Sequence, residues 1–227
     1  MEIGMLDTIL AVAGLAAAFI VPGTIEYLKR PKLEIVPGSW VPPGPAPWTF
    51  ASVRIRNKKI AGPVGRFLGR DTAQACVVEI DYYRWDSQEK AIPTVTGRWD
   101  SHPQPERRVP LDMTNATIGS TEADHEILQP SRLVYDPSLD IPQHDITVGY
   151  DIGQVSVAIL RNGEAFAFAN ESYAYLANEL GKPEWKLSKG TYRIVVHVRP
   201  SNAGEQKQTF KLEYLTDNFR DFQLHEI

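Results

Sequence analysis

The sequence predicts an all-β domain, a β-sandwich, preceded by a single N-terminal transmembrane helix. Residues 8–25 carry no charged side chain, which indicates a membrane anchor. Many later segments alternate apolar and polar residues, as strands with one buried face do. Asn162-Gly163 joins two such segments and predicts a β-hairpin. We therefore expect an anchor with its basic flank at residues 1–30, a sandwich at residues 31–215 and a polar C-terminal tail at residues 216–227.

The uncharged run is long enough to cross a bilayer as a helix. About 18 residues at about 1.5 Å each span roughly 27 Å, close to the roughly 30 Å hydrocarbon core. Glu2 and Asp7 make the leading residues acidic, unlike the basic start of a cleaved secretory signal, so we expect an uncleaved signal-anchor. The alternative is a buried helix of a soluble protein, but such a helix normally has a polar face that this run lacks.

The orientation of the anchor follows from its flanks. Lys29, Arg30 and Lys32 follow the run and no basic residue precedes it. Because Lys and Arg are retained on the cytoplasmic side, we expect the folded domain to face the cytoplasm. Gly14 and Ala18 are four residues apart, a spacing that lets two membrane helices approach closely and indicates a helical protein partner. The alternative is that alanine is simply a helix-forming filler.

The net charge of −4 conceals a division along the chain. Residues 29–70 contain nine basic residues and one acidic residue, a net charge of +8, and residues 71–227 carry −9. We predict that the basic segment contacts anionic lipid headgroups. The candidate contact residues are Lys29, Arg30, Lys32, Arg54, Arg56, Lys58 and Lys59. The alternative is a solvated strand face and loop, and nucleic acid is not expected as a partner because the acidic remainder would repel phosphates.

The sandwich strands are expected where apolar residues alternate. They are residues 32–36, 48–56, 74–85, 92–99, 126–128, 133–135, 146–160, 165–168, 192–198 and 208–214. In the second of these strands, Val53 and Ile55 should share one face, with Arg54 and Arg56 on the other. The proline-rich residues 37–47 predict a stiff loop or, alternatively, a ligand for a proline-binding module. Residues 171–180 predict one short helix that ends at Gly181.

One motif near the C-terminus resembles a known family. Leu187, Gly190 and Tyr192 have the pattern Leu-x-x-Gly-x-Tyr and precede the alternating Ile194, Val196 and Val198. This resembles the tyrosine corner of immunoglobulin-like and fibronectin type III-like Greek-key sandwiches. The resemblance implies that the Tyr192 hydroxyl bonds back across the corner, and a binding role more than chemistry. Residues 86–183 exceed a minimal sandwich and are expected to hold inserted hairpins and the helix, or else to indicate a different sandwich topology.

No motif for catalysis, cofactors or metal binding is found. The five histidines lack zinc spacing, and no Gly-x-Ser-x-Gly elbow is present. Asp136, Asp140, Asp145 and Asp151 lack the spacing of a calcium loop. Cys76 is the single cysteine and lies in an apolar run, which predicts a buried structural thiol. We therefore predict a protein that is not an enzyme and holds no cofactor or metal.

Four aromatic residues on neighbouring expected strands suggest a binding surface. They are Tyr82, Tyr83, Trp85 and Trp99. An exposed row of rings can bind a sugar or a peptide. The alternative is that half of the rings fill the core and half cover the strand edge.

Together, these observations predict a membrane-anchored, non-enzymatic interaction or scaffold module at the cytoplasmic membrane face. Its expected partners are anionic lipids and a protein. One alternative is the same sandwich on the outside of the membrane as a glycan- or protein-binding domain. A second alternative is a hydrolase whose dispersed acidic residues form an unrecognised site.

Overall fold

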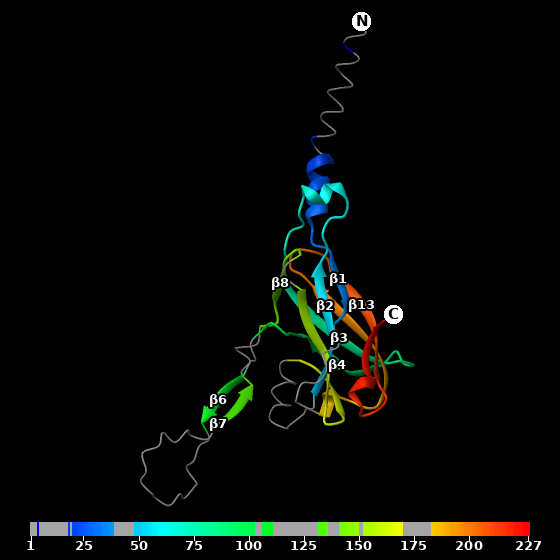
Figure 1. Cartoon of the computed structure of the whole chain (residues 1–227). Coiled ribbons are helices and arrows are strands. Elements are labelled where there is room, and N and C mark those ends of the chain that lie inside the picture. Colours follow the sequence, from blue (N-terminus) through cyan, green and yellow to red (C-terminus); the bar gives the residue numbers. More distant parts are fainter. Residues whose placement is uncertain are drawn as a thin grey trace, which may run out of the picture.

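The computed structural model describes residues 4, 18, 20–38, 48–102, 106–110, 131–135, 141–149, 152–169 and 183–227. These residues form an all-β body of two antiparallel sheets, with a helical segment at residues 20–29 that projects from one end (Figure 1). The two-sheet architecture expected from the alternating segments is present.

The first sheet has the strand order β1-β2-β9-β10-β11, and β5 pairs with β9 beside this path. Its strands are β1 (Leu33–Pro37), β2 (Trp48–Asn57), β5 (Arg98–Trp99), β9 (Ile152–Arg161), β10 (Glu164–Ala167) and β11 (Lys186–Leu187). In β2, Val53 and Ile55 are fully buried, whereas Arg56 is exposed and Arg54 is half-buried. The predicted division of this strand into an inner and an outer face is confirmed.

The second sheet has the order β14-β13-β12-β3-β4, and β8 pairs with the start of β3. Its strands are β3 (Ala73–Arg84), β4 (Lys90–Thr96), β8 (His144–Ile146), β12 (Gly190–Arg199), β13 (Gln206–Tyr214) and β14 (Phe222–Glu226). A separate two-stranded sheet pairs β6 (Glu106–Pro110) with β7 (Ser131–Tyr135). The described part of the chain also contains the short 3₁₀ helices η1 (Pro63–Arg66), η3 (Pro183–Trp185) and η4 (Phe219–Asp221).

The core lies between the inner faces of the two main sheets. Tyr82 on β3 is fully buried, and its hydroxyl donates a hydrogen bond of 2.5 Å to the Val157 carbonyl on β9. Trp99 is 1% exposed and its indole N–H donates to the Pro142 carbonyl at 2.9 Å. Both large rings therefore bury their apolar surface and still satisfy their polar atoms.

Two local predictions are confirmed in detail. Asn162 and Gly163 have positive φ angles of 50° and 78°, as a type I′ turn requires, and they connect β9 to β10. The Tyr192 hydroxyl donates a 2.5 Å hydrogen bond to the Ser188 carbonyl, four residues back. The bond across the corner is therefore present, and Tyr192 is 1% exposed.

The strand expected at residues 92–99 is instead two strands in different sheets. β4 pairs with β3, whereas β5 pairs with β9. Gly97 lies at the crossing, where a Cβ atom would come within 2.9 Å of the Val155 side chain and 3.0 Å of Val78. Alternation continues through both strands, but the close approach at Gly97 takes the chain from one sheet to the other.

The segment expected as a polar tail contains a strand. β14 pairs with β13, and Phe222 is 1% exposed with its ring against Tyr214 at 6.1 Å between centroids. The tail therefore begins with structured residues that extend the second sheet. The interpretation of a polar tail overlooked the apolar residues of this segment, which are Phe219, Phe222, Leu224 and Ile227.

Several expectations lie outside the described residues. They include the proline-rich loop from residue 39 to residue 47, the strand at residues 126–128, the helix at residues 171–180 and most of the membrane anchor, residues 8–17 and 19. Among the residues that are described, no helix is long and apolar enough to span a bilayer. The predicted transmembrane helix is thus without support from the described structure.

Candidate functional site

The helical segment and a loop lie side by side above one end of the sandwich. We call residues 20–32 together with residues 58–71, which include η1, the stem (Figure 1). The Arg70 guanidinium donates to the Leu28 and Arg30 carbonyls at 2.9 Å each, and the Asp71 amide donates to the Lys29 carbonyl at 2.7 Å. Carbonyls at a helix C-terminus lack partners within the helix, and a cation there is favourable. Arg70 therefore caps the helix and joins it to the loop.

Asn57 connects the stem to the sandwich. It is 4% exposed, and its side-chain oxygen accepts from the Lys32 amide at 3.1 Å. Its amide nitrogen donates to the Asp71 carbonyl at 2.8 Å and to the Ile146 carbonyl at 3.4 Å. One buried side chain therefore joins both arms of the stem to β8, and the stem is an extension of the sandwich with defined geometry.

The loop around η1 directs apolar side chains outward. The Val64 carbonyl accepts from the Phe67 amide at 3.1 Å and from the Leu68 amide at 3.0 Å. At Gly65, a Cβ atom would lie 1.9 Å from the Ile60 carbonyl oxygen, so only glycine allows this close packing. Val64 is 48% exposed and Phe67 is 90% exposed as a result.

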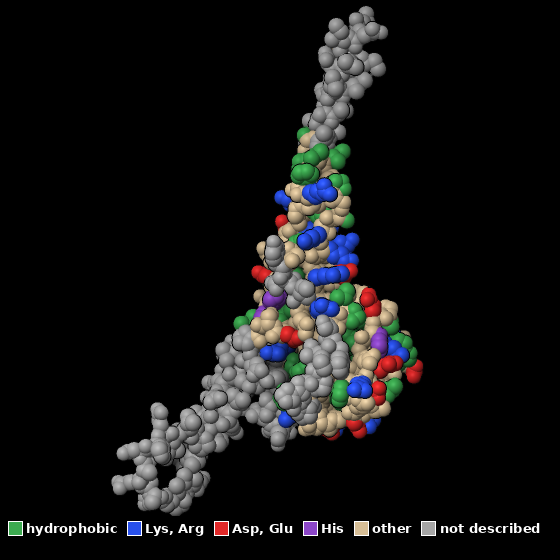
Figure 2. Space-filling view, in the orientation of Figure 1, with side chains coloured by type: hydrophobic (Ala, Val, Ile, Leu, Met, Phe, Trp, Pro, Cys, Tyr) green, Lys and Arg blue, Asp and Glu red, His purple; other side chains and the backbone are tan. Residues whose placement is uncertain are grey.

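Basic side chains surround the stem below its apolar part. Figure 2 shows Lys and Arg side chains gathered there, between apolar side chains further out and the sandwich. The seven basic residues of the stem are Lys29, Arg30, Lys32, Lys58, Lys59, Arg66 and Arg70. Of these, Arg30, Lys32, Lys59 and Arg66 are exposed and form no ion pair with a described residue. Earlier in the helical segment, Ile20, Val21 and Tyr27 are 64%, 51% and 70% exposed.

The structure separates the seven basic residues predicted to contact the membrane into two groups. Lys29, Arg30, Lys32, Lys58 and Lys59 belong to the stem, whereas Arg54 and Arg56 lie on the outer face of β2. Arg56 and Lys58 both pair with Glu34, the latter at 2.6 Å. Hydrogen bonds from Lys58 and then Arg56 lower the pKa of the Glu34 carboxyl. Arg56 is therefore neutralised by a neighbour from β1 and is a weaker candidate for binding an anion.

Sequence reasoning missed Tyr27, Val64, Phe67 and the capping role of Arg70. The loop of residues 57–70 is rich in glycine but does not end in the Gly-Lys-Ser or Gly-Lys-Thr of a phosphate-binding loop, so its glycines do not indicate a binding site. The available signal was Phe67 itself, because an aromatic residue follows Arg66 in a loop without acidic residues.

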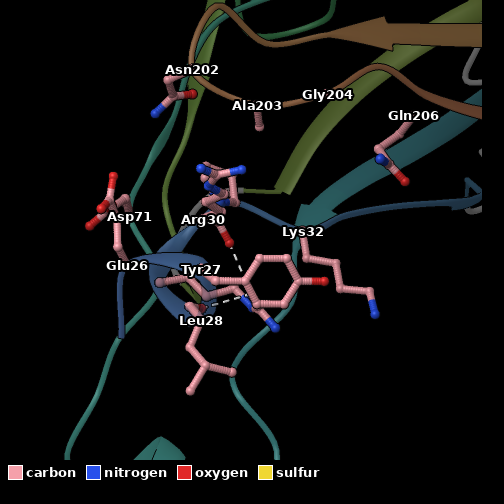
Figure 3. Close-up of a pocket in the computed structure, with 12 residues that line it drawn as sticks. Glu26, Tyr27, Leu28, Arg30, Lys32, Asp71, Asn202, Ala203, Gly204 and Gln206 are labelled. Atoms are coloured by element: carbon pink, nitrogen blue, oxygen red, sulfur yellow. Dashed lines mark hydrogen bonds between the residues drawn. The ribbon is translucent and has the colours of Figure 1, made fainter. Parts of the chain in front are cut away.

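A cleft of about 850 Å³ lies between the stem and the loop that joins β12 to β13. Figure 3 shows Tyr27, Leu28 and Lys32 on one side and Asn202, Ala203 and Gln206 on the other. The Asn202 side chain is engaged with the sandwich, since it donates to the Thr72 carbonyl and accepts from the Gln74 amide. The walls of the cleft combine acidic, basic and apolar residues.

The four aromatic candidates divide between the core and the surface. Tyr82 and Trp99 are buried, whereas Tyr83 is half-buried and Trp85 is 41% exposed. The Arg193 guanidinium lies 4.8 Å from the Tyr83 ring centre, and the Lys211 ammonium lies 5.5 Å from that of Trp85. Two rings fill the core and two lie on the outer face against cations of the same domain, which matches the alternative of a divided role.

Two further groups of side chains with reactive atoms are Cys76 and the pair His102 and His144. Cys76 is fully buried, as predicted, and burial together with the nearby Asp145 carboxylate raises the pKa of its thiol to about 12. His102 Nε2 and His144 Nδ1 are 3.3 Å apart beside the Trp99 ring. Across the described ranges, no three His, Cys, Asp or Glu side chains are grouped to hold a metal ion. Asp136, Asp140 and Asp151 lie outside those ranges.

Comparisons with protein-family models, curated proteins and solved structures find no match to this chain. The candidate site is therefore defined by its own geometry: a fixed stem with apolar side chains outermost and unpaired cations beneath them.

Proposed function

We propose that this chain is a β-sandwich module held by its N-terminal helix at the cytoplasmic face of a membrane, where it binds or braces another protein. The observation that carries the proposal is the order of side chains along the stem. Exposed Ile20 and Val21 come first along the helical segment, and the unpaired cations Arg30 and Lys32 come at its end, next to β1. Figure 2 shows the same order of side-chain types, with apolar side chains further out and basic ones nearer the sandwich.

This order suits the boundary between hydrocarbon and water. Apolar side chains gain about 25 cal/mol per Å² when they leave water, whereas Lys and Arg near anionic headgroups gain about 1 kcal/mol each. Ile20 and Val21 are part of the uncharged run of residues 8–25, which has the length and composition of a membrane anchor. The cations after the run favour a cytoplasmic domain. Gly14 and Ala18 favour a helical partner within the bilayer.

The sandwich supports a role in interaction. Its order β3-β12-β13 parallels strands C, F and G of immunoglobulin-like sandwiches, and β1-β2-β9 parallels strands A, B and E. The hydrogen bond from Tyr192 to Ser188 is consistent with the tyrosine corner of those folds. We therefore infer an immunoglobulin-like or fibronectin type III-like Greek-key sandwich with inserted hairpins, a fold that more often binds than catalyses.

The test is the membrane topology of the full chain. We expect the protein in the membrane fraction after alkaline extraction, and we expect the domain to resist protease added to intact cells and to be digested after lysis. Replacing Leu10 and Leu15 with arginine should release the protein, since each arginine near the centre of a spanning helix costs roughly 3 kcal/mol. The matched control is the double replacement with alanine, which should keep the protein in the membrane.

Two outcomes would change the proposal. A domain digested from outside intact cells would support the extracytoplasmic binding module instead. Quantitative recovery of the wild-type chain in the soluble fraction would overturn the membrane placement altogether.

A further inference from the structure

We infer that the loop of residues 62–68 is a second membrane contact, which inserts Phe67 and Val64 into the headgroup and acyl boundary of an anionic bilayer beside the helix. This inference rests on the proposed function. With two contacts, the sandwich has a fixed orientation on the lipid surface, whereas with the helix alone it could rotate freely at the end of its anchor.

The exposure of Phe67 is the first observation. At 90% exposed it is the most exposed large apolar side chain among the described residues. Burying a phenylalanine side chain is worth about 1.5–3 kcal/mol, and in the isolated chain this gain is unused. Val64 is 48% exposed in the same loop, so the two side chains offer an apolar tip.

The rigidity of the loop is the second observation. Gly65 packs against the Ile60 carbonyl, and Val64 accepts hydrogen bonds from the Phe67 and Leu68 amides. Arg70 joins the end of the loop to the helix. The tip is therefore held in place before it meets lipid, which reduces the conformational entropy lost on binding.

Charge identifies the occupant as an anionic bilayer. Residues 57–70 contain Lys58, Lys59, Arg66 and Arg70 and no acidic residue. The tip also belongs to the same end of the molecule as the exposed Ile20 and Val21, which are part of the uncharged run, and Tyr27, which follows it. A segment with exposed apolar side chains next to cations binds the membrane–water interface in two ways. The apolar side chains are buried among the lipids, and the cations are attracted to anionic headgroups.

The test uses the full chain in lipid nanodiscs with and without phosphatidylserine. A polarity-sensitive fluorophore is attached at Phe67→Cys, and the buried Cys76 is left in place. The control position is Glu89→Cys in the turn after β3. β3 begins two residues after the stem and has 12 residues, so at about 3.3 Å per residue this turn lies roughly 35–40 Å away.

We expect a blue shift of the Phe67→Cys probe that grows with phosphatidylserine content, and no shift at Glu89→Cys. A water-exposed probe at position 67, in a protein that stays with the nanodiscs, would overturn the inference and leave the proposed function standing. Failure of the chain to associate with nanodiscs at all would instead overturn the proposed function and the inference together.

A second measurement avoids any effect of the probe. Val64→Ser with Phe67→Ser removes the apolar tip, and Leu215→Ser is the matched control because Leu215 is 54% exposed just after β13, at the far end of the second sheet. We expect the serine pair to raise the protease sensitivity of the nanodisc-bound stem several-fold. The control should leave it unchanged. Equal sensitivity of all three proteins, with unchanged thermal stability, would contradict the inference.

Discussion

The stem and the sandwich differ in whether their surface cations have acidic partners. On the sandwich, cations lie beside acidic partners: Lys90 with Asp81 at 2.8 Å, Arg199 with Glu79 at 2.7 Å and Lys211 with Glu213 at 2.6 Å. On the stem, Arg30, Lys32, Lys59 and Arg66 have no acidic partner among the described residues. These three sandwich cations are neutralised by acidic neighbours of the same domain, whereas the four stem cations have no such neighbour among the described residues.

The same contrast holds for apolar surface. The sandwich buries large rings such as Tyr82 and Trp99 almost completely, but the stem exposes Tyr27 and Phe67. Exposed apolar side chains that lie together commonly mark an interaction site. The comparison shows that the sandwich buries its largest rings within its own core, whereas the stem leaves Tyr27 and Phe67 in contact with water. We propose that anionic lipid covers the apolar surface of the stem.

The largest expected effect tests the sandwich side of the comparison. Trp99→Ala should lower the free energy of unfolding by about 3–5 kcal/mol, because it empties a buried site and removes the hydrogen bond to Pro142. Trp85→Ala, at an exposed ring of the same type, should cost less than about 1 kcal/mol. Chemical denaturation of the variants measures both values, and similar losses would contradict the assignment of Trp99 to the core and Trp85 to the surface.

The next effect tests the stem side. Neutralising three unpaired cations, with Lys32→Gln, Lys59→Gln and Arg66→Gln, should weaken docking on anionic nanodiscs by up to about 3 kcal/mol, or roughly a hundredfold. The probe at Phe67→Cys reports the docked fraction. The matched control neutralises three paired cations of the sandwich, which are Lys90, Lys211 and Lys186, the last paired with Glu164 at 2.5 Å. It should leave docking unchanged. Equal losses in both triples would remove the distinction between the two regions.

A third prediction concerns the junction between the regions. Asn57→Ala should cost about 2 kcal/mol, since the Lys32 amide and the Asp71 carbonyl lose a buried partner. Asn202→Ala, an exposed asparagine that also bonds two backbone groups, should cost less than about 1 kcal/mol. Denaturation combined with amide hydrogen exchange at residues 28–32 checks this. Unchanged exchange in Asn57→Ala would show that the stem does not depend on this residue.

A fourth prediction tests the corner of the sandwich. Tyr192→Phe keeps the ring but loses the hydrogen bond to Ser188, and should cost about 1 kcal/mol. Tyr83→Phe is the control, because its hydroxyl contacts Asp81 only at 3.4 Å. The thermal midpoint of the first variant should fall while that of the second stays the same.

The smallest effects should appear as opposite pH dependences. Burial raises the pKa of the Asp100 carboxyl, and hydrogen bonds from Ser156 and Gln154 partly oppose this rise. The stability that this carboxyl contributes is therefore present below its unfolded pKa of about 3.9 and is lost as pH rises through its folded pKa. Asp100→Asn should therefore gain stability relative to wild type as pH rises above about 3.9. Solvent screening should keep the gain below about 1 kcal/mol.

Glu34 supplies the comparison with the opposite sign. Its lowered pKa means that its contribution is present above an unfolded pKa of about 4.3 and is lost as pH falls through the folded value. Glu34→Gln should consequently lose stability relative to wild type as pH rises into the neutral range. Thermal midpoints measured between acid and neutral pH check both variants, and a change of Asp100→Asn or Glu34→Gln opposite to its expected direction would contradict the assignment of that carboxyl.

Local chemistry allowed much of the fold to be predicted from the sequence. The hairpin at Asn162-Gly163 depends on two adjacent residues that accept positive φ, and the two faces of β2 depend on alternation within one strand. The corner at Tyr192 spans only four residues back to Ser188. Each of these features is complete within a short stretch, so the stretch itself carries the signal.

The candidate site was predicted less completely. Lys29, Arg30 and Lys32 were identified from their position after the uncharged run, and that position also places them on the stem. Phe67 was missed because its exposure depends on the conformation and position of its loop. Gly65 allows the loop to pack closely, and Arg70 holds it beside a helix about 40 residues earlier in the chain. Arg56 was overestimated because Glu34, its partner, comes from a different strand.

By itself the sequence determined the class of the fold, the strand faces, the tight hairpin and the separation of a basic segment from an acidic remainder, because periodicity, turn preference and composition act over neighbouring residues. Tertiary structure alone decided the change of sheet at Gly97, the pairing of β14 with β13, the hub at Asn57 and the exposure of Phe67. Those features arise from contacts between residues far apart in the chain, whose free energy no local pattern records.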